Sequence, residues 1–401
     1  MTGWGRPAVV VTFAAAAILM VTMGARNTLG LFVSPINSAT GLGVVTISFA
    51  MAVAQFTWGA VQPVAGALAD RHGPRPILIG GLVLLAFGTA LTPFMSSGVG
   101  LVFAMGLLSA MGAGAASFSV LLGAAAQRMP AEARGTASGV INAGGSFGQF
   151  VFAPVTQKLI QVFGWAGAMW GLAVMMLVAL PLVGLVARGG PAPQKGGSRP
   201  WSAVREAMRD RSYLLLHAGF FTCGFHIAFL VTHLPGEVDL CGLPATVASW
   251  SLAIIGLANI AGSLLAGAAV SRYRSKYALA LMYASRALLI AVYLAAPKTE
   301  ATFYLFAFGL GLTWLSTVPP TATIVGKLFG IRYLATLFGL TLLSHQIGAF
   351  FGAYLGGLAL ERTGNYQWMW YADIALAAFA ALVNLPIREA RLEPARSAAP
   401  A

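Results

Sequence analysis

The sequence predicts an all-α integral membrane protein in which twelve membrane-spanning helices form two pseudo-symmetric six-helix halves. Of the 401 residues, 58% are hydrophobic and only 9% are charged, whereas soluble domains carry about 25% charged residues. Apolar segments of about twenty residues, the length that crosses a bilayer, recur along the whole chain. A loop in the first half also returns in weaker form in the second half, as in transporters built from structural repeats.

The expected spans are separated by short polar connections and one longer one. They cover residues 8–34, 44–69, 75–94, 98–125, 135–160, 163–187, 212–235, 244–270, 276–296, 301–326, 333–359 and 366–387. The longest polar stretch, RGGPAPQKGGSRPWSAVREAMRDR, begins as a Gly/Pro/Ser-rich linker, and its second half is compatible with a short surface helix. We therefore expect an N-terminal half at 1–187, a cytoplasmic linker at 188–211 and a C-terminal half at 212–401.

The distribution of positive charge predicts the orientation. Most of the 24 Lys and Arg residues fall in connections on one side of the expected membrane, and Lys158, Lys298 and Arg362 fall on the other. Cationic connections stay in the cytoplasm, so we expect a multi-pass protein of the cell (inner) membrane with both termini cytoplasmic. The net charge of +13 is spread between apolar segments, which argues against binding of nucleic acid.

A loop sequence marks the internal repeat. The connection after the second span reads GALADRHGPRPIL from Gly66, and the connection after the eighth reads GAAVSRYRSKYAL from Gly267. An offset of about 200 residues also places Arg26 opposite His226. Two halves related in this way hold a site at their interface in one known transporter architecture.

The first copy of this loop resembles the signature of the major facilitator superfamily. The matching residues are Gly66, Asp70, Arg71, Gly73 and Arg75, and with twelve expected spans the resemblance covers the whole chain. It implies the major facilitator fold, with this loop contributing to conformational switching on the cytoplasmic side.

Two further segments resemble the monocarboxylate transporter and oxalate–formate antiporter branch of that superfamily. They are RNTLGLFVSPI in the first span and RMPAEARGTASGVINAGGSFGQFVFAP entering the fifth. Members of the branch usually carry a functional arginine in the eighth helix. Here the eighth span has only Asn259 and Ser263 as candidates for polar contacts, and the arginine, Arg286, lies in the ninth.

Arg26 is the first candidate for substrate binding. A cation at membrane depth costs at least ~2.5–3.5 kcal/mol, so it is retained where it faces a polar cavity or a partner. Arg26 lies ~12 Å from the outer end of the first span at the rise of an α-helix, and its guanidinium matches the geometry of a carboxylate. The alternative is an arginine bound by backbone carbonyls or reaching outward to the interface.

Arg286, near the middle of the ninth span, has two open interpretations. It either contacts the anionic substrate or forms a structural ion pair with Asp373, the clear carboxylate within a C-terminal span. We expect substrate contact, because an unpaired guanidinium near the midplane complements an anionic cargo.

Histidines supply candidates for proton coupling, because histidine titrates near neutral pH. His226 and His233 are seven residues apart on one face of the seventh span, and His345 lies within the eleventh. We expect at least one of them, or Asp373, to carry a proton, although buried histidines are also common packing residues.

Neutral polar residues complete the expected substrate site. These are Gln55, Asn142, Trp314 and Gln346, together with His345. Beyond Trp314, the pair Pro319-Pro320 should bend the tenth span, because proline removes backbone donors.

The function expected from these features is secondary active transport of a small organic anion, a mono- or dicarboxylate, by alternating access. Protons or a counter-substrate would supply the energy, since no GxxxxGK[ST] phosphate loop is present. We expect no metal, no cofactor, no enzymatic activity and a monomer in the lipid bilayer. The alternatives are an exporter of neutral drugs or metabolites with the same fold, and a non-transporting membrane sensor.

Overall fold

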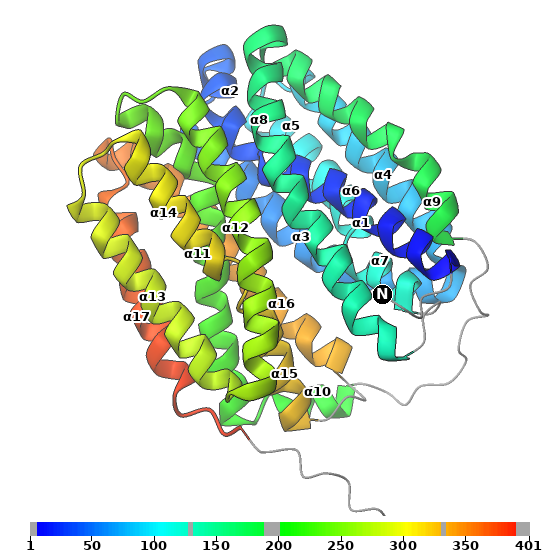
Figure 1. Cartoon of the computed structure of the whole chain (residues 1–401). Coiled ribbons are helices and arrows are strands. Elements are labelled where there is room, and N and C mark those ends of the chain that lie inside the picture. The colour runs from blue at the N-terminus through cyan, green and yellow to red at the C-terminus, as the bar shows by residue number, and fades with distance from the viewer. Residues whose placement is uncertain (1–5, 127–130, 188–200, 330–333, 390–401) are drawn as a thin grey trace, which may run out of the picture.

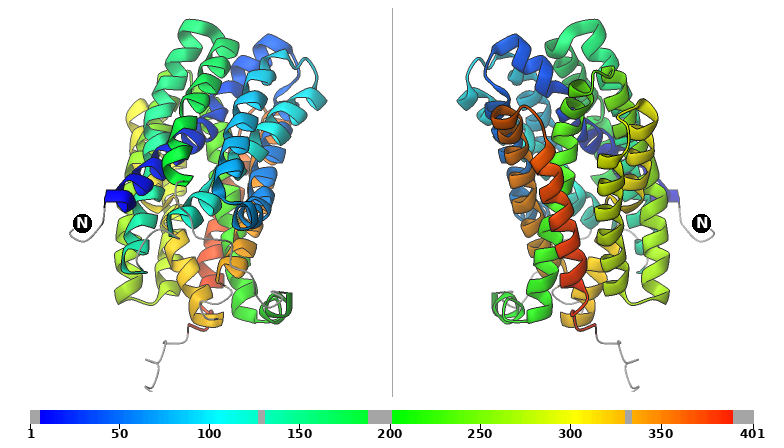
Figure 2. Two further views of the ribbon diagram at one scale, coloured as in Figure 1. Left: turned by 90° about the vertical axis from the view of Figure 1, so that its right-hand side faces the viewer. Right: turned by 90° about the vertical axis from the view of Figure 1, so that its left-hand side faces the viewer.

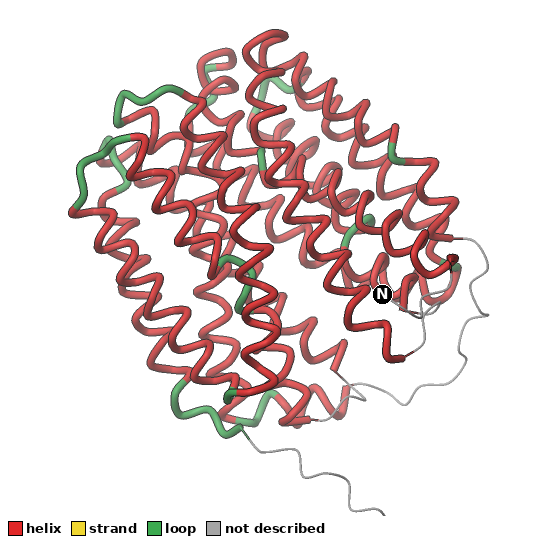
Figure 3. Tube along the Cα trace, in the orientation of Figure 1, coloured by secondary structure: helices red, strands yellow, loops and turns green. Residues whose placement is uncertain are grey.

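The computed structural model describes residues 6–126, 131–187, 201–329 and 334–389, and every regular element in these ranges is a helix. Figure 1 shows the helices as one bundle, and Figure 3 shows how short the connections between them are. The elements of the first half are α1 (Arg6–Asn27), η1 (Leu29–Phe32), α2 (Val33–Thr40), α3 (Val44–His72), α4 (Pro74–Leu91), η2 (Thr92–Phe94), α5 (Gly98–Leu101), η3 (Val102–Ser109), α6 (Ala110–Ala115), α7 (Phe118–Ala126), α8 (Ala131–Val178) and α9 (Leu180–Ala187).

The second half follows a short helix, α10 (Trp201–Ala207), at the place where the sequence allowed a surface helix. Its elements are α11 (Arg211–Leu240), α12 (Ala245–Arg272), α13 (Ser275–Ala295), α14 (Glu300–Thr313), α15 (Val318–Phe329), α16 (Leu334–Thr363) and α17 (Gln367–Asn384). The long helices run roughly side by side in all views (Figure 2).

Nine segments of the described chain are long and apolar enough to cross a membrane. One of them, of 48 residues, covers both the fifth and the sixth expected span. The last two expected spans coincide with α16 and α17, in which polar residues lower the mean hydropathy. The all-helical membrane fold is therefore confirmed, and the count of twelve spans stays a prediction.

Glycine and proline divide the long helices. Gly164 has a φ of 70°, a left-handed conformation that favours glycine, and it turns the chain within α8 between the fifth and sixth expected spans. In the tenth expected span, α14 ends at Thr313 and α15 begins at Val318, directly before Pro319 and Pro320. Proline fits the first turn of a helix, where its missing N–H is not needed, so the predicted bend is a complete break.

The helix packing has the pseudo-symmetry that the loop repeat suggested. Within the first half α1 packs extensively on α8, and within the second half α11 packs in the same way on α16. Between the halves, α3 packs on α16 and α8 packs on α12, as Figure 1 shows for the latter pair. The α1–α8 contact thus corresponds to the α11–α16 contact, and the α3–α16 contact corresponds to the α12–α8 contact. This is the relation expected for two structural repeats in a transporter. The exact division at residues 187 and 212 stays a prediction.

The halves meet at one end of the bundle. Toward the ends of α3 and α16 predicted to face outward, a Cβ at Gly357 would clash with Ser48 Oγ. Nearer the middle of the bundle, Phe49 packs edge-on against Phe350, and Gln149 Nε2 donates to Leu252 O at 2.9 Å. Toward the opposite ends, the positions that a Cβ would take at Gly139, Gly267 and Gly339 have no described atom within 4 Å. The contacts between the halves among the described residues therefore lie mainly on the predicted outer side.

Candidate functional site

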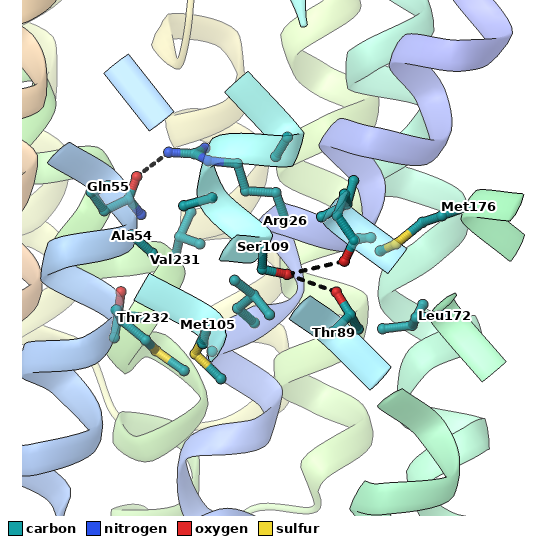
Figure 4. A pocket seen from close by; sticks show the side chains of 17 residues that line it. Arg26, Ala54, Gln55, Thr89, Met105, Ser109, Leu172, Met176, Val231 and Thr232 are labelled. Carbon is teal, nitrogen blue, oxygen red and sulfur yellow. Dashed lines mark hydrogen bonds between the residues drawn. The ribbon is translucent and has the colours of Figure 1, made fainter. Parts of the chain in front are cut away.

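A cavity of about 40 Å³ lies beside Arg26, inside the first half and against α11 (Figure 4). This is several times the space that one buried water needs. The lining is contributed by α1, η1, α3, α4, η3, α6, α8 and α11, and consists of Ala25, Arg26, Leu29, Gly30, Met51, Ala54, Gln55, Leu85, Thr89, Met105, Ser109, Ala110, Ala113, Leu172, Met176, Val231 and Thr232. Most of this lining is apolar, so the few polar groups determine what can bind.

Arg26 lies in the last turn of α1, where the backbone dipole favours a cation. Its Nη2 donates to Gln55 Oε1, and its Nη1 lies 3.4 Å from Asn27 Oδ1. The guanidinium carbon lies 4.2 Å from the centre of the Trp58 ring, a favourable cation–π contact. Neither of the two ion pairs in the described chain involves Arg26. The charge is thus held by neutral dipoles, and these two contacts use only part of the donor capacity of a guanidinium that lines the cavity.

Two hydroxyl groups form the other polar part of the lining. Thr89 Oγ1 on α4 lies 2.8 Å from Ser109 Oγ, and Ser109 Oγ lies 3.3 Å from Leu85 O. Ser109 ends η3, a π-helix of eight residues, and such segments are rare and frequent at functional sites. The sequence analysis missed both residues, because a neutral Thr and Ser in apolar helices give no signal that separates them from packing residues.

The other expected substrate residues lie in different places. Gln55 lines the Arg26 cavity, and Asn142 lines a smaller neighbouring cavity of about 10 Å³ together with Asn27 and Gln149. Trp314 and His345 do not line the cavity beside Arg26 and are buried in the second half. Gln346 is buried as well, and its side chain packs against α3.

Arg286 is fully buried and does not pair with Asp373 in this structure, so the alternative of a structural ion pair is not found, and the expected substrate contact stays a prediction. Its Nη2 donates to the carbonyls of Thr313 and of Trp314, the latter at 2.8 Å, and its Nη1 lies 3.3 Å from Cys223 Sγ. The break between α14 and α15 explains these partners. Val318 N donates to Leu315 O at 3.1 Å, so the carbonyl of Trp314 lacks its usual helical donor, and the guanidinium takes that place.

Asp373 instead contacts His226, at 2.5 Å between Oδ2 and Nδ1. Both side chains are fully buried, and the second atoms, His226 Nε2 and Asp373 Oδ1, have no hydrogen-bond partner in the described chain. Two of the four proton-coupling candidates are therefore brought together by α11 and α17.

The remaining histidines have separate surroundings. His233 Nε2 lies 2.7 Å from Ala353 O, and its Nδ1 lies 3.4 Å from the Tyr366 hydroxyl. His345 Nδ1 lies 3.2 Å from Gln346 Nε2. No three His, Cys, Asp or Glu side chains of the described residues are grouped as a metal site would require.

The predicted switch loop is a tight turn between α3 and α4. Gly73 has a φ of 83°, which favours glycine, and α4 starts at Pro74 with Arg75 exposed. Gly66 lies within α3, while the side chains of Asp70 and Arg71 lie outside the described part of the chain. The switching role of this loop stays a prediction.

Two pseudo-symmetric helical halves that contact one another across α3–α16 and α8–α12 follow the plan of known membrane transporters. The sequence matches the family model of the Major Facilitator Superfamily over residues 15–353 and 239–400. The chain belongs to this family, as the signature loop predicted.

The curated relatives include both members of the predicted branch. The chain is 26% identical to monocarboxylate transporter 13 of Rattus norvegicus over 400 residues, which cover 96% of this chain and 89% of that protein. It is 24% identical to the oxalate:formate antiporter of Oxalobacter formigenes over 364 residues, which cover 88% and 84%.

Among solved structures, the chain superimposes on the D-xylose-proton symporter with a TM-score of 0.75 at 15% identity, covering 95% of this chain and 98% of that one. This similarity supports the major facilitator fold.

Proposed function

We propose that the protein is a secondary active transporter that moves a small organic anion by alternating access, with Arg26 as the anion-binding residue. The observation that carries this proposal is an arginine without an acidic partner in the described chain, facing an internal cavity. A guanidinium in such a place is stable when a counter-ion arrives, and its planar fork favours a carboxylate.

The surroundings of Arg26 support binding of an anion that is later released. Gln55 and Asn27 hold the guanidinium through neutral oxygens, so a carboxylate does not compete with a fixed negative charge. Trp58 covers one face of the guanidinium and leaves its edges for hydrogen bonds. The names of the relatives, a monocarboxylate transporter and an oxalate:formate antiporter, agree with such a cargo.

The buried pair of His226 and Asp373 is our candidate for proton coupling. Nδ1 and Oδ2 are close enough to share a proton, and the two unpartnered atoms leave room for a change of protonation state. In this proposal, His233 and His345 are secondary candidates. If the protein instead exchanges one anion for another, these groups keep one protonation state throughout.

The remaining expectations belong to the same proposal. The N-terminal half contributes Arg26 and the cavity, the loop from Gly66 to Arg75 governs the switch between conformations, and both termini lie in the cytoplasm. The contact of the halves on the outer side then corresponds to a conformation open to the cytoplasm.

A transporter of neutral compounds is the second candidate, because Met51, Met105 and Met176 give the cavity a flexible apolar lining. Such a protein would use Arg26 only as a structural residue.

Uptake into proteoliposomes separates these possibilities. We expect wild-type protein to accumulate short carboxylates and the variant Arg26→Ala to lose this uptake. The matched control is Arg205→Ala, which removes an exposed arginine on α10. Normal carboxylate uptake by a folded Arg26→Ala protein would exclude the proposed role. Stimulation by an inward proton gradient indicates symport, and dependence on carboxylate inside the vesicles indicates exchange.

A further inference from the structure

The hydroxyl pair of Thr89 and Ser109 lies in the same cavity as Arg26 and has no part in holding it (Figure 4). Thr89 comes from α4 and Ser109 from the end of the π-helix η3. Both side chains are buried, with exposed fractions of 5% and 8%. Buried hydroxyls are normally hydrogen-bonded, so the way these two are bonded decides what they can offer to a ligand.

Both hydroxyl hydrogens already take part in hydrogen bonds within the protein, but lone pairs on the two oxygens remain available as acceptors. A hydroxyl carries one donor hydrogen and two acceptor lone pairs. Ser109 donates to Leu85 O, which leaves Thr89 as the donor in the contact between the two hydroxyls. The pair therefore presents acceptors to the cavity. A ligand hydroxyl can donate a hydrogen bond to this pair. A ligand carbonyl or carboxylate has only acceptors and would form no hydrogen bond with it.

The charge of the cavity lining also disfavours a negatively charged group beside the two hydroxyls. Arg26 is the single charged side chain among the residues that line the cavity in the described chain. A second carboxylate on the ligand would therefore face hydroxyl acceptors and methionines, with no cation to receive it. Burial of an unpaired charge is costly, so the cavity disfavours dianions.

We infer that Thr89 and Ser109 form a specificity subsite that receives a neutral hydroxyl at the end of the substrate remote from its carboxylate. This inference rests on the proposed function, because it requires an anion at Arg26. It narrows the substrate class to monoanions with a distal hydroxyl and ranks plain alkyl acids and dicarboxylates below them.

The test compares three four-carbon acids that differ only in their last group: butanoate, 4-hydroxybutanoate and butanedioate. Their binding to purified full-length protein is measured by the ligand-induced shift in melting temperature, which reports the dissociation constant. We expect 4-hydroxybutanoate to bind about three- to tenfold more tightly than butanoate, as one buried hydrogen bond provides. Butanedioate should bind more weakly than either. Shorter and longer pairs of the same kind locate the best distance from Arg26.

Two variants assign the preference to the subsite. Thr89→Val keeps the shape of the side chain and should reduce the preference for the hydroxyl to below about twofold, while leaving butanoate binding within about twofold. Thr89→Ser should retain the preference. The matched control is Thr92→Val, since Thr92 is the buried threonine directly after α4, donates to Gly88 O and does not line the cavity.

The outcomes separate this inference from the proposed function. If no acid binds, or if Arg26→Gln binds all three as well as wild-type protein does, the proposed anion site is wrong and the inference falls with it. If the acids bind through Arg26 but no hydroxyl preference appears at any length, or if the preference survives in Thr89→Val, only the subsite is wrong.

Discussion

The interiors of the two halves share a framework but not a chemistry. The offset from Gly66 to Gly267 carries Leu85 to Arg286 and Leu172 to Asp373. The two leucines line a cavity, whereas the two charged residues are fully buried among polar groups. The repeat therefore preserves helix packing, while the residues that fill each half have diverged.

The different residues inside the two halves suit them to different roles. The first half keeps one unpaired cation beside a space that a ligand can enter. The second half holds Arg286 on backbone carbonyls and Asp373 on a histidine, and neither residue lines the described cavity. In our proposal the first half binds the cargo and the second half carries the proton. The following predictions test that division, beginning with the largest expected effect.

The first prediction concerns the charges of the second half. Asp373→Ala removes the partner of His226 and should lower the free energy of unfolding by ~3–5 kcal/mol, as loss of one member of a buried pair does. A double-mutant cycle with His226→Ala should show strong coupling, and one with Arg286→Ala weak coupling, because Arg286 and Asp373 have different partners. Unfolding in detergent measures both. Strong coupling between Arg286 and Asp373 would contradict the observed contacts.

The second prediction compares Arg286 with Arg26. Arg286→Ala leaves the buried carbonyl of Trp314 with only a weak donor, the Cys223 thiol at 4.0 Å, so it should lower the free energy of unfolding by ~1–3 kcal/mol. Arg26→Ala should lower the free energy of unfolding by less than half as much as Arg286→Ala does, but it should abolish anion binding. Melting temperatures and binding of a short carboxylate are measured side by side. If Arg286→Ala stays fully stable and loses anion binding, Arg286 contacts the substrate after all.

The all-helical membrane fold and the polar surroundings of Arg26 could be predicted because each depends on local sequence. Apolar segments of sufficient length indicated membrane-spanning helices, and a lone cation in such a segment needs polar partners, which Gln55 and Asn27 supply. The partners of Arg286 could not be predicted, since they arise from a helix break in a distant segment. Thr89 and Ser109 became visible only when α4 and η3 were packed together.

The third prediction compares the turns that precede α4 and α13, which are predicted to be cytoplasmic. The first starts α4 with Pro74, which needs no partner for its nitrogen, whereas the second starts α13 with backbone N–H groups of Ser275 and Lys276 that bind Glu389. Lys327 Nζ also lies 2.5 Å from Glu389 Oε1. Burial raises the pKa of Glu389, but the hydrogen bonds from Lys327 and the two N–H groups outweigh it, and the pKa lies below its ordinary value.

A carboxylate with a lowered pKa in the folded state stabilises the fold above its ordinary pKa of about 4.5, and this contribution is lost as the pH falls through the folded-state pKa. Glu389→Gln should therefore cost ~1–2 kcal/mol at pH 7 and progressively less below pH 4.5. Unfolding measured across this range checks the sign. A constant difference between the two proteins would show that ionisation of Glu389 does not matter.

The smallest expected effect concerns the contact between the halves. A Cβ at Gly256 would lie 2.7 Å from Ser146 O and 2.9 Å from Phe150 N, whereas one at Gly339 would meet no described atom within 4 Å. Gly256→Ala should loosen the contact between α12 and α8 by ~1 kcal/mol, and Gly339→Ala should be neutral in this conformation. Labelling of single cysteines on the outer side measures the difference. Equal labelling of both variants would mean that Gly256 does not limit the approach of α12 to α8.

The break between α14 and α15 also gives Arg286 the role of a helix cap that comes from another helix. In an unbroken helix the carbonyl of Trp314 would bind the backbone N–H four residues ahead, whereas here it accepts a hydrogen bond from Arg286 Nη2 at 2.8 Å. The same guanidinium also donates to the hydroxyl and the carbonyl of Thr313, the last residue of α14. Basic side chains commonly satisfy the last carbonyls of their own helix, but the end of α14 is capped by a residue of α13.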